Sequence, residues 1–386
     1  MQLRRALLIT AALAWAADLR ADDTKLVERV TTEVAAYADT DHVAVLTPSI
    51  GGHIESPTAG WSLDGSYLVD AISAASVDIV STASPRWTEV RQAGNARIAY
   101  GRGDWSGAVE GSLSSEPDYL AFAAGGYLTR DFDQHNVSVI IGYGYGHDTI
   151  GRAGTPFTVY SHSFDHNAFH AGFTRLIDRR TVLAVSADVT IENGDSSKPY
   201  RYTPVFAPEV APLVPAGATL ADLNRLGFVA RAIERLPLSR DRFGLTARLA
   251  HRLRRSTLRV EAMLYDDSWG LKALSGDGRW LFDIGSHLSL GPHLRAYGQS
   301  PVSFWKLAYV GTADSVPAFR TGDRELGPLV NLTTGGSARW DLWPRWKMQS
   351  WAVVTSVDTN YTHFSDDLYI TRRASILTTA ALEASW

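Results

Sequence analysis

Three histidines recur at intervals of four residues, at His162, His166 and His170. On a helix, an interval of four would place two imidazoles on one face, as in a zinc site. Residues 165–177 alternate as a strand instead, and along a strand His166 and His170 would lie about 13–14 Å apart, too far for one metal ion. The spacing favours structural histidines, and we expect neither a metal site nor a cofactor.

Residue types used in hydrolysis occur together at Ser161-His162 and at His363-Phe364-Ser365-Asp366. Such residues can supply a nucleophile when its base lies in hydrogen-bond contact. Neither place has a Gly-x-Ser-x-Gly context, and we find no phosphate loop or dinucleotide fingerprint in context. We therefore expect that the protein is not an enzyme, and keep a hydrolase as the least favoured alternative.

Two adjacent acids, Asp266 and Asp267, precede Trp269 at the end of an alternating segment. Such a pair could hold Ca²⁺ through its carboxylate oxygens. Solvated acids in a loop are several times more common, so we favour that interpretation. In the same way, the small and polar residues of 72–86, which include Ser73 and Asp78, could fold into a pore but are also typical of an external loop.

The overall composition excludes several classes of protein. The chain has 386 residues, no cysteine and a net charge of −4. The absence of cysteine excludes disulfides, thiolate metal sites and cysteine nucleophiles. The charge gives no basic field that would favour nucleic acid.

The N-terminus has the form of a secretory signal. Arg4 and Arg5 precede the apolar residues 6–17, which end with a small-x-small site at Ala14-Trp15-Ala16, and Leu19-Arg20-Ala21 is a looser alternative site. The apolar run is shorter than the roughly 20 residues that a membrane-spanning helix needs. We therefore predict a cleaved signal peptide at 1–21 and a mature chain at 22–386.

The mature region alternates between apolar and polar residues almost throughout. In 181–193, for example, apolar residues share one face, whereas Ser186, Asp188, Thr190 and Glu192 share the other. We count about 16 such segments, most of about 11–14 residues, whereas ordinary globular strands have about five or six. Tilted membrane strands need about 9–11 residues. The pattern predicts an all-β fold, a transmembrane antiparallel up-and-down β-barrel.

The predicted connections alternate in length. The long ones all follow odd-numbered strands, at 72–86, 148–164, 194–240, 269–278, 302–326 and 358–373. Bacterial outer-membrane barrels have short periplasmic turns and longer outer loops. We therefore expect an outer-membrane location with a periplasmic N-terminus. Within the longest loop, Thr219 to Leu226 has the pattern of a capped two-turn helix.

Aromatic residues fit the same fold. The chain ends at Trp386, and a final strand with an aromatic end resembles the signal read by the outer-membrane assembly machinery. Tryptophans near strand ends suit interfacial girdles. They are Trp61, Trp87, Trp105, Trp280, Trp340, Trp343 and Trp346.

Five stretches, at 67–78, 114–119, 265–270, 295–300 and 323–327, resemble a family of bacterial proteins of unknown function that are predicted to be outer-membrane barrels. The most specific are Tyr265-Asp266-Asp267-Ser268-Trp269-Gly270 and Arg295-Ala296-Tyr297-Gly298-Gln299-Ser300. In the family the Trp-Gly pair follows the two acids more directly, so Ser268 is a departure. The resemblance implies architecture and location but no activity. It marks these residues, whose role it leaves open: Asp70, Ser73, Asp78, Asp266, Asp267, Trp269 and Gln299.

Many charges fall on the predicted inward face, since a charge facing lipid would cost about 2–4 kcal/mol at the midplane. The first nine strands place mostly acids inside, and strands ten to fourteen place mostly arginines. The acids are Glu33, Asp64, Glu89, Glu110, Asp188 and Glu192, and the arginines are Arg242, Arg248, Arg252, Arg259, Arg295 and Arg339. Either these charges line a pore, or they pair with one another and plug it.

Three functions remain open at this point. The first is a porin-like channel for small polar solutes, as a charged lumen within 16 strands predicts. The second is a closed barrel that anchors or scaffolds a larger envelope complex, with an envelope protein partner bound through loop 194–240. The third is a barrel-wall hydrolase. The expected partners in every case are outer-membrane lipid and lipopolysaccharide, with the assembly machinery during biogenesis and no nucleic acid.

Overall fold

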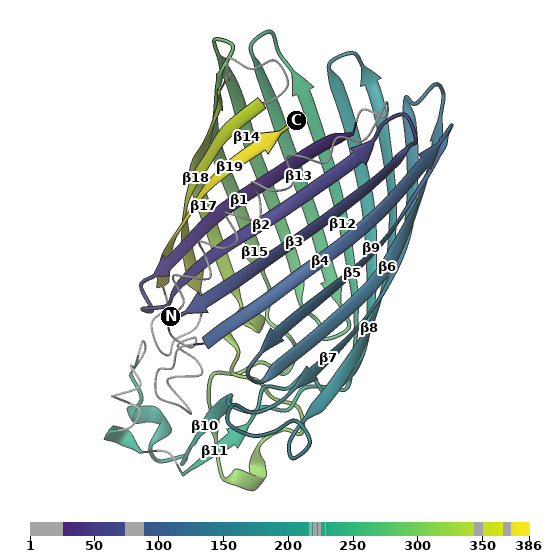
Figure 1. The fold of residues 1–386 in the computed structure, drawn as a ribbon. Helices are drawn as coiled ribbons and strands as arrows, with labels where there is room; N and C mark the ends of the chain where they lie inside the picture. Colours follow the sequence, from purple (N-terminus) through teal and green to yellow (C-terminus); the bar gives the residue numbers. More distant parts are fainter. Residues whose placement is uncertain are drawn as a thin grey trace, which may run out of the picture.

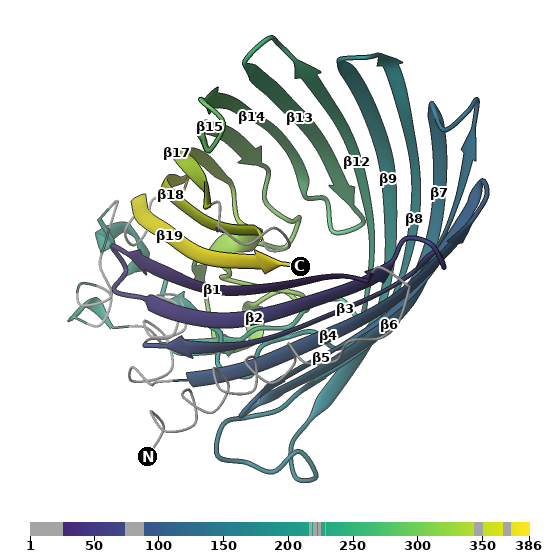
Figure 2. The ribbon, with the colours of Figure 1, turned by 45° about the horizontal axis from the view of Figure 1, so that its top comes forward.

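Most of the chain forms one closed sheet. The computed structural model describes residues 26–73, 89–215, 218, 222, 225–227, 229–342, 350–365 and 372–386. Within them, 16 antiparallel strands close into a barrel, as Figure 1 and Figure 2 show. The predicted fold class, an all-β barrel of about 16 strands, is confirmed. The predicted signal peptide lies outside the described residues.

The barrel strands are 12 to 17 residues long. They are β1 (Val27–Asp39), β2 (Ala44–Ser56), β3 (Trp61–Ile72), β4 (Glu89–Arg102), β5 (Trp105–Glu116), β6 (Tyr119–Phe132), β7 (Val137–Ile150), β8 (His162–Asp178), β9 (Thr181–Gly194), β12 (Ser239–Arg252), β13 (Ser256–Asp267), β14 (Lys272–Ile284), β15 (Leu288–Gln299), β17 (Leu329–Leu342), β18 (Ser350–Phe364) and β19 (Arg372–Ser385).

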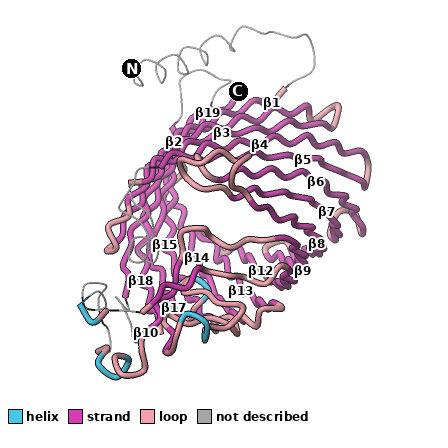
Figure 3. Tube along the Cα trace, turned by 90° about the horizontal axis from the view of Figure 1, so that it is seen from below, coloured by secondary structure: helices cyan, strands magenta, loops and turns pink. Residues whose placement is uncertain are grey.

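The first and last strands close the ring, which Figure 3 shows from one end. β1 pairs with β19 from Arg29 opposite Ser385 to Asp39 opposite Ser375. Beyond the ladder, the Glu28 amide donates to the Trp386 carbonyl at 2.9 Å, and the Trp386 amide donates back at 3.0 Å. Closure gives every strand a hydrogen-bonded neighbour on both sides. A sheet inside a membrane requires this, because no water is present there to pair with free backbone groups.

The two faces of the sheet differ in polarity. On β5, Val109 and Leu113 are 62% and 65% exposed, and the period of two turns Glu110 to the opposite face. Cross-strand register carries the apolar face around the barrel, since Val109 lies opposite Ile98 of β4, which is 56% exposed. An apolar exterior of this extent requires an apolar surrounding. The polar face lines the lumen, so the fold is that of a membrane-spanning β-barrel.

The described residues contain no helix with both the length and the apolar character that a bilayer-spanning helix requires.

The described tryptophans of the predicted girdle lie beside tight turns at one end of the barrel. Trp61, Trp105, Trp280 and Trp340 are all exposed on the outer face. The Arg130 guanidinium lies 4.9 Å from the ring centre of Trp105. This arrangement is typical of side chains at a membrane–water interface. The other predicted members, Trp87, Trp343 and Trp346, lie outside the described residues.

The opposite end of the barrel carries the long connections at 151–161, 195–238 and 300–328. Of the predicted loop 72–86, residues 74–86 lie outside the described residues. β7 and β8 extend further into one predicted loop, and β18 continues to Phe364, so those loops are shorter than the sequence suggested.

The predicted long loop at 269–278 is wrong. β14 begins at Lys272, so only 268–271 connect β13 and β14. The Asp267 carboxylate accepts hydrogen bonds from the Trp269 and Leu271 amides, both at 3.0 Å, and Gly270 adopts a positive φ of 93°. This tight turn lets the glycine-containing segment 272–278 pair with β13 rather than form a loop.

Residues 195–238 and 300–328 fold together into a small unit, which we call the cap. It contains a second sheet, ordered β11-β10-β16, from β10 (Tyr202–Phe206), β11 (Ala230–Ile233) and β16 (Tyr309–Val310). Figure 1 shows β10 and β11 beyond the lower end of the barrel. In the predicted two-turn helix, the described residues Asp222, Arg225 and Leu226 are helical, and the rest lies outside the described residues.

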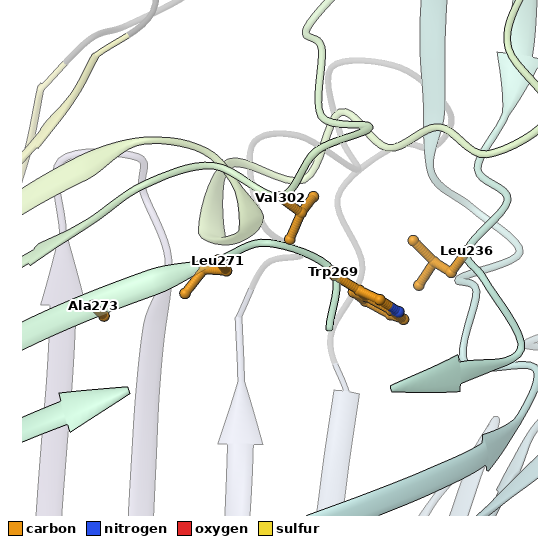
Figure 4. Packing of buried hydrophobic residues seen from close by; sticks show 5 residues of the cluster. All are labelled: Leu236, Trp269, Leu271, Ala273 and Val302. Atoms are coloured by element: carbon orange, nitrogen blue, oxygen red, sulfur yellow. The ribbon is translucent and has the colours of Figure 1, made fainter. Parts of the chain in front are cut away.

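The buried apolar clusters belong to the cap and to its junction with the barrel. One cluster consists of Phe206, Ala218 and Leu307 within the cap. The other, shown in Figure 4, combines Leu236 and Val302 of the cap with Trp269, Leu271 and Ala273 of the β13–β14 hairpin. The cap is therefore packed onto the barrel rim as a folded unit.

Candidate functional site in the barrel lumen

The predicted lumen charges lie on the inward face of the barrel, because the register places them opposite inward neighbours. They are Glu33, Asp64, Glu89, Glu110, Asp188, Glu192, Arg242, Arg248, Arg252, Arg259, Arg295 and Arg339. The acids come from β1–β9 and the arginines from β12–β17. Figure 2 shows β12–β15 facing β1–β5 across the barrel. The two groups also meet, where β9 adjoins β12.

The ion pairs of the lumen run along its wall. Arg242 binds Glu192 on the adjacent strand at 2.9 Å, and Arg248 binds Glu261 on its neighbour. Arg252 reaches Asp283 two strands away at 2.5 Å, and Arg339 reaches Glu383 two strands away at 2.8 Å. Among the described strand residues, these and the other ion pairs join strands at most two positions apart around the barrel. Charge pairing between the described strand residues therefore does not bridge the lumen.

Residues of β3–β9 form a concavity of about 760 Å³ in one part of the lumen wall. Small inward residues make it hollow: Ala123, Gly125, Gly142, Gly144 and Ala168. Polar side chains surround the hollow, and two are held in place by neighbours. His170 pairs with Asp188 at 2.7 Å, and the Tyr127 hydroxyl donates to Glu110 at 3.1 Å.

A His–Asp network that the sequence analysis missed lies on the other wall. The His293 side chain, 9% exposed, contacts Asp277 at 2.7 Å through Nε2 and Asp358 at 2.8 Å through Nδ1. Asp358 reaches His293 across β17, where a Cβ on Gly335 would lie 2.1 Å from the Asp358 oxygen. The available signal was the inward position of His293 and Asp358 on strands that flank Gly335 and Gly336. The sequence does not show that these strands lie side by side.

The structure does not bring the predicted histidine cluster together. His162 donates from Nε2 to the Ser197 carbonyl at 2.8 Å, while Ser161 donates to the Phe157 carbonyl. His166 lies over Gly146. Ser161 and His162 are therefore engaged with backbone groups rather than with each other. Of the second candidate group, Asp366 lies outside the described residues.

Three carboxylates meet at the cap end of the lumen and could hold a cation. Oxygens of Glu89, Glu116 and Asp118 lie within 4.8 Å of one another. The cap supplies a competing cation nearby, since the Lys198 ammonium lies 4.8 Å from the ring centre of Tyr119. Burial lowers the pKa of Lys198, whereas Glu116 acts to raise it. This cluster by its own geometry does not indicate a metal.

The first motif stretch places two of its marked residues beside the mouth. Asp70 is buried and accepts hydrogen bonds from Arg91 at 2.6 Å and from the Thr47 hydroxyl at 2.5 Å. The Ser73 hydroxyl accepts from the Ala44 amide at 3.0 Å. Asp78 lies outside the described residues. Asp70 and Ser73 therefore order the ends of β2 and β3.

The two adjacent acids of the third stretch differ completely. Asp266 lies on the outward face opposite Lys272 of β14. The Asp267 side chain is fully buried and binds Arg240, whose Nε donates at 2.9 Å. The Arg240 guanidinium in turn lies 4.3 Å from the ring centre of Trp269. Asp267 is therefore a buried structural ion rather than a solvated loop acid.

The fourth and fifth stretches, at 295–300 and 323–327, fasten the cap to the rim. The Gln299 side-chain amide donates to the carbonyls of Glu325 and Gly327, at 2.8 and 2.7 Å. Arg324 lies 3.7 Å from the ring centre of Phe364 at the end of β18. The motif residues of three stretches thus converge on one junction, which holds the cap against β13–β18.

The predicted assembly residue, Trp386, lies where the barrel closes. Its indole Nε1 donates to the Glu28 carboxylate, in addition to the two backbone bonds described above. Its side chain is 36% exposed. This position is compatible with a role in closing the barrel between β1 and β19.

Several solved barrels are similar to this chain at low sequence identity. The siderophore receptor PirA from Acinetobacter baumannii matches with a TM-score of 0.41 and 10% identity over 88% of this chain, which spans about half (53%) of the receptor. The outer membrane protein OpdK from Pseudomonas aeruginosa matches with a TM-score of 0.45 and 7% identity over 94% of this chain and 99% of OpdK. The toluene transporter TodX from Pseudomonas putida matches with a TM-score of 0.40 and 10% identity over 95% and 90% of the two chains.

No functionally curated protein is similar to this chain in sequence. A family model does match, over the region from β8 to the start of β18 that includes the cap and three of the five motif stretches. The expected resemblance is thereby confirmed for that region: residues 165–352 of this outer-membrane-type barrel match the family described as "Protein of unknown function (DUF3570)".

Proposed function

We propose that the protein is a porin-like channel that lets small polar solutes diffuse through a charged lumen. The observation that carries this proposal is the direction of the ion pairs, which connect neighbouring positions of the wall. Charges that plugged the lumen would have to pair across it. Sixteen-stranded barrels have a circumference that leaves room for water inside when side chains do not fill them.

The hollow wall supports the same proposal. Inward positions of β6–β8 carry glycine and alanine where larger side chains would narrow the passage. The polar groups around them, including Glu110, Asp188 and Arg97, can replace part of the hydration of a passing solute. Both signs of charge are present, which suits polar and zwitterionic solutes better than apolar ones.

Conductance tests this proposal. The folded protein in planar bilayers should give discrete openings, and Ala123→Trp, which adds an indole to the inward hollow, should lower the single-channel conductance. The neighbouring Ala124→Trp adds the same group to the outward face and should leave conductance at the wild-type value. A pure, folded preparation without openings would refute the channel, and equal effects of the two substitutions would refute the assigned passage.

A second candidate function has one observation in its favour. The cap is a folded unit with largely buried ion pairs, among them Arg201 with Asp323 at 2.7 Å, rather than a loose loop. A preformed surface of this kind suits a scaffold that binds an envelope protein. Purification from native membrane, with and without a deletion of the cap, distinguishes the two functions: a scaffold would lose a co-purifying protein, whereas a channel would retain its conductance.

A further inference from the structure

An arginine row interrupts the ion-paired wall of the lumen. Arg259 of β13 lies directly opposite Arg279 of β14, and Arg279 lies directly opposite His293 of β15. All three side chains point into the barrel. Side chains paired in this way have Cβ atoms about 4.5–5.5 Å apart, and like charges in such positions repel each other. The row is therefore electrostatically unfavourable unless something neutralises it.

The acids nearby are already engaged. Asp277 lies close to His293, at 2.7 Å, and farther from Arg279, at 3.6 Å. Glu261 of β13 binds Arg248, which lies directly opposite it on β12. Among the described residues, the Arg259 side chain has neither an ion pair nor a hydrogen bond. Asp277 and Asp358 both bind His293, and of these two only Asp277 also contacts an arginine, Arg279. The two permanent positive charges of the row therefore have one shared carboxylate between them.

The arginines border a hollow of about 360 Å³. Three of its other inward neighbours, Val182, Ala184 and Ala250, are small enough to leave the guanidinium groups uncovered. The charged side chains of Arg248, Glu261 and Asp277 also line it, so positive charge is in excess by one among the five ionised groups. A volume of this size is in the range of small-ligand sites, which are roughly 300–1,000 Å³. The row therefore has space beside it for a solute and not only for the side chains themselves.

We infer that Arg259 and Arg279 form a binding site for small solutes that carry a carboxylate or phosphate group. A guanidinium presents parallel N–H donors that match the spacing of oxygens in either group. An oxyanion between the two arginines would remove the repulsion that Asp277 compensates only in part. The inference rests on the proposed channel, because it names the solutes that the lumen would concentrate.

Equilibrium binding to the folded full-length chain tests the site without requiring an open channel. Titration calorimetry in detergent would use inorganic phosphate and succinate as separate probes, which distinguishes phosphate from carboxylate recognition. We expect wild-type protein to bind at least one probe at millimolar concentrations or below. The double variant Arg259→Gln/Arg279→Gln should bind at least tenfold more weakly.

Arg29→Gln provides the matched control, since Arg29 also points inward, on β1, away from the row. Arg29→Gln should bind the probes as wild type does. Failure of wild type to bind either probe, or an equal loss in the control, would overturn the site. Binding by a protein that never conducts would refute the channel and leave the site standing, whereas conduction without binding would do the reverse.

Discussion

The buried pair of Arg240 and Asp267 gives the sharpest prediction about the cap. Their side chains are 9% and 0% exposed. Asp267→Ala would leave the Arg240 charge buried without its partner, and would also remove the acceptor of the Trp269 and Leu271 amides. Removing one member of a buried ion pair costs about 3–5 kcal/mol. The rim hairpin and the cap packed on it should therefore open far more often.

A loss of 3–5 kcal/mol corresponds to a change of about 10²- to 10⁴-fold in the opening equilibrium. Limited proteolysis reports this equilibrium when reclosing is faster than cleavage. Trypsin should cut the variant within the cap, where Arg235, Lys306 and Arg320 offer sites, at least a hundredfold faster than wild type. The barrel strands should stay intact, because the substituted residue, Asp267, lies at the very end of β13, at the rim of the barrel.

The neighbouring acid provides the control for this experiment. Asp266→Ala changes the same residue type one position earlier, on the outward face opposite Lys272. It should be cleaved at the wild-type rate. Wild-type cleavage of a folded Asp267→Ala protein would show that the buried pair does not hold the cap, and equal acceleration by both substitutions would show that the effect is not specific to burial.

Three further predictions concern the lumen, the cap and the closure between β1 and β19. Gly335→Ala would bring a Cβ within 2.1 Å of the Asp358 carboxylate, so it should lower the urea midpoint of unfolding, whereas Gly336→Ala, whose Cβ meets nothing closer than 3.4 Å, should not. The Tyr200 hydroxyl of the cap donates to the Asp118 carboxylate at 2.9 Å, and burial together with this carboxylate raises the pKa of Tyr200 to about 12. Docking of this tyrosine therefore adds stability that is fully present below pH 10 and is lost as the pH rises toward 12. Absorbance titration of wild type minus Tyr200→Phe should show a midpoint near 12, and a midpoint near 10 would contradict the docked position. Trp386→Ala should slow folding into lipid vesicles. The shift in electrophoretic mobility between unheated and heated samples measures this rate, and an unchanged rate would show that the tryptophan has no role in barrel closure.

The sequence alone was sufficient for the barrel, because alternation is a local property. A period of two maintained over strands longer than globular proteins use separates an apolar exterior from a polar interior. The same period puts Glu110 and Arg248 inside without reference to any other strand. It failed at 269–278, which we predicted to be a long loop, because the Asp267 carboxylate closes the turn early.

The junction of cap and barrel was beyond the reach of sequence reasoning. Adjacent acids such as Asp266 and Asp267 must face opposite sides of a strand, but the sequence does not say which one meets Arg240. β10 pairs with β16 although about a hundred residues separate them, and no local period marks such a contact.

What the sequence determined, then, is the architecture and the inward set of charges, since both follow from residues close together in the chain. Only the tertiary structure decided which charges are partnered. Strand register and cross-strand reach give Asp358 to His293 over a glycine, and leave Arg259 beside Arg279 with no acid of its own. Partnership of this kind depends on distances across the sheet, which chain order does not specify.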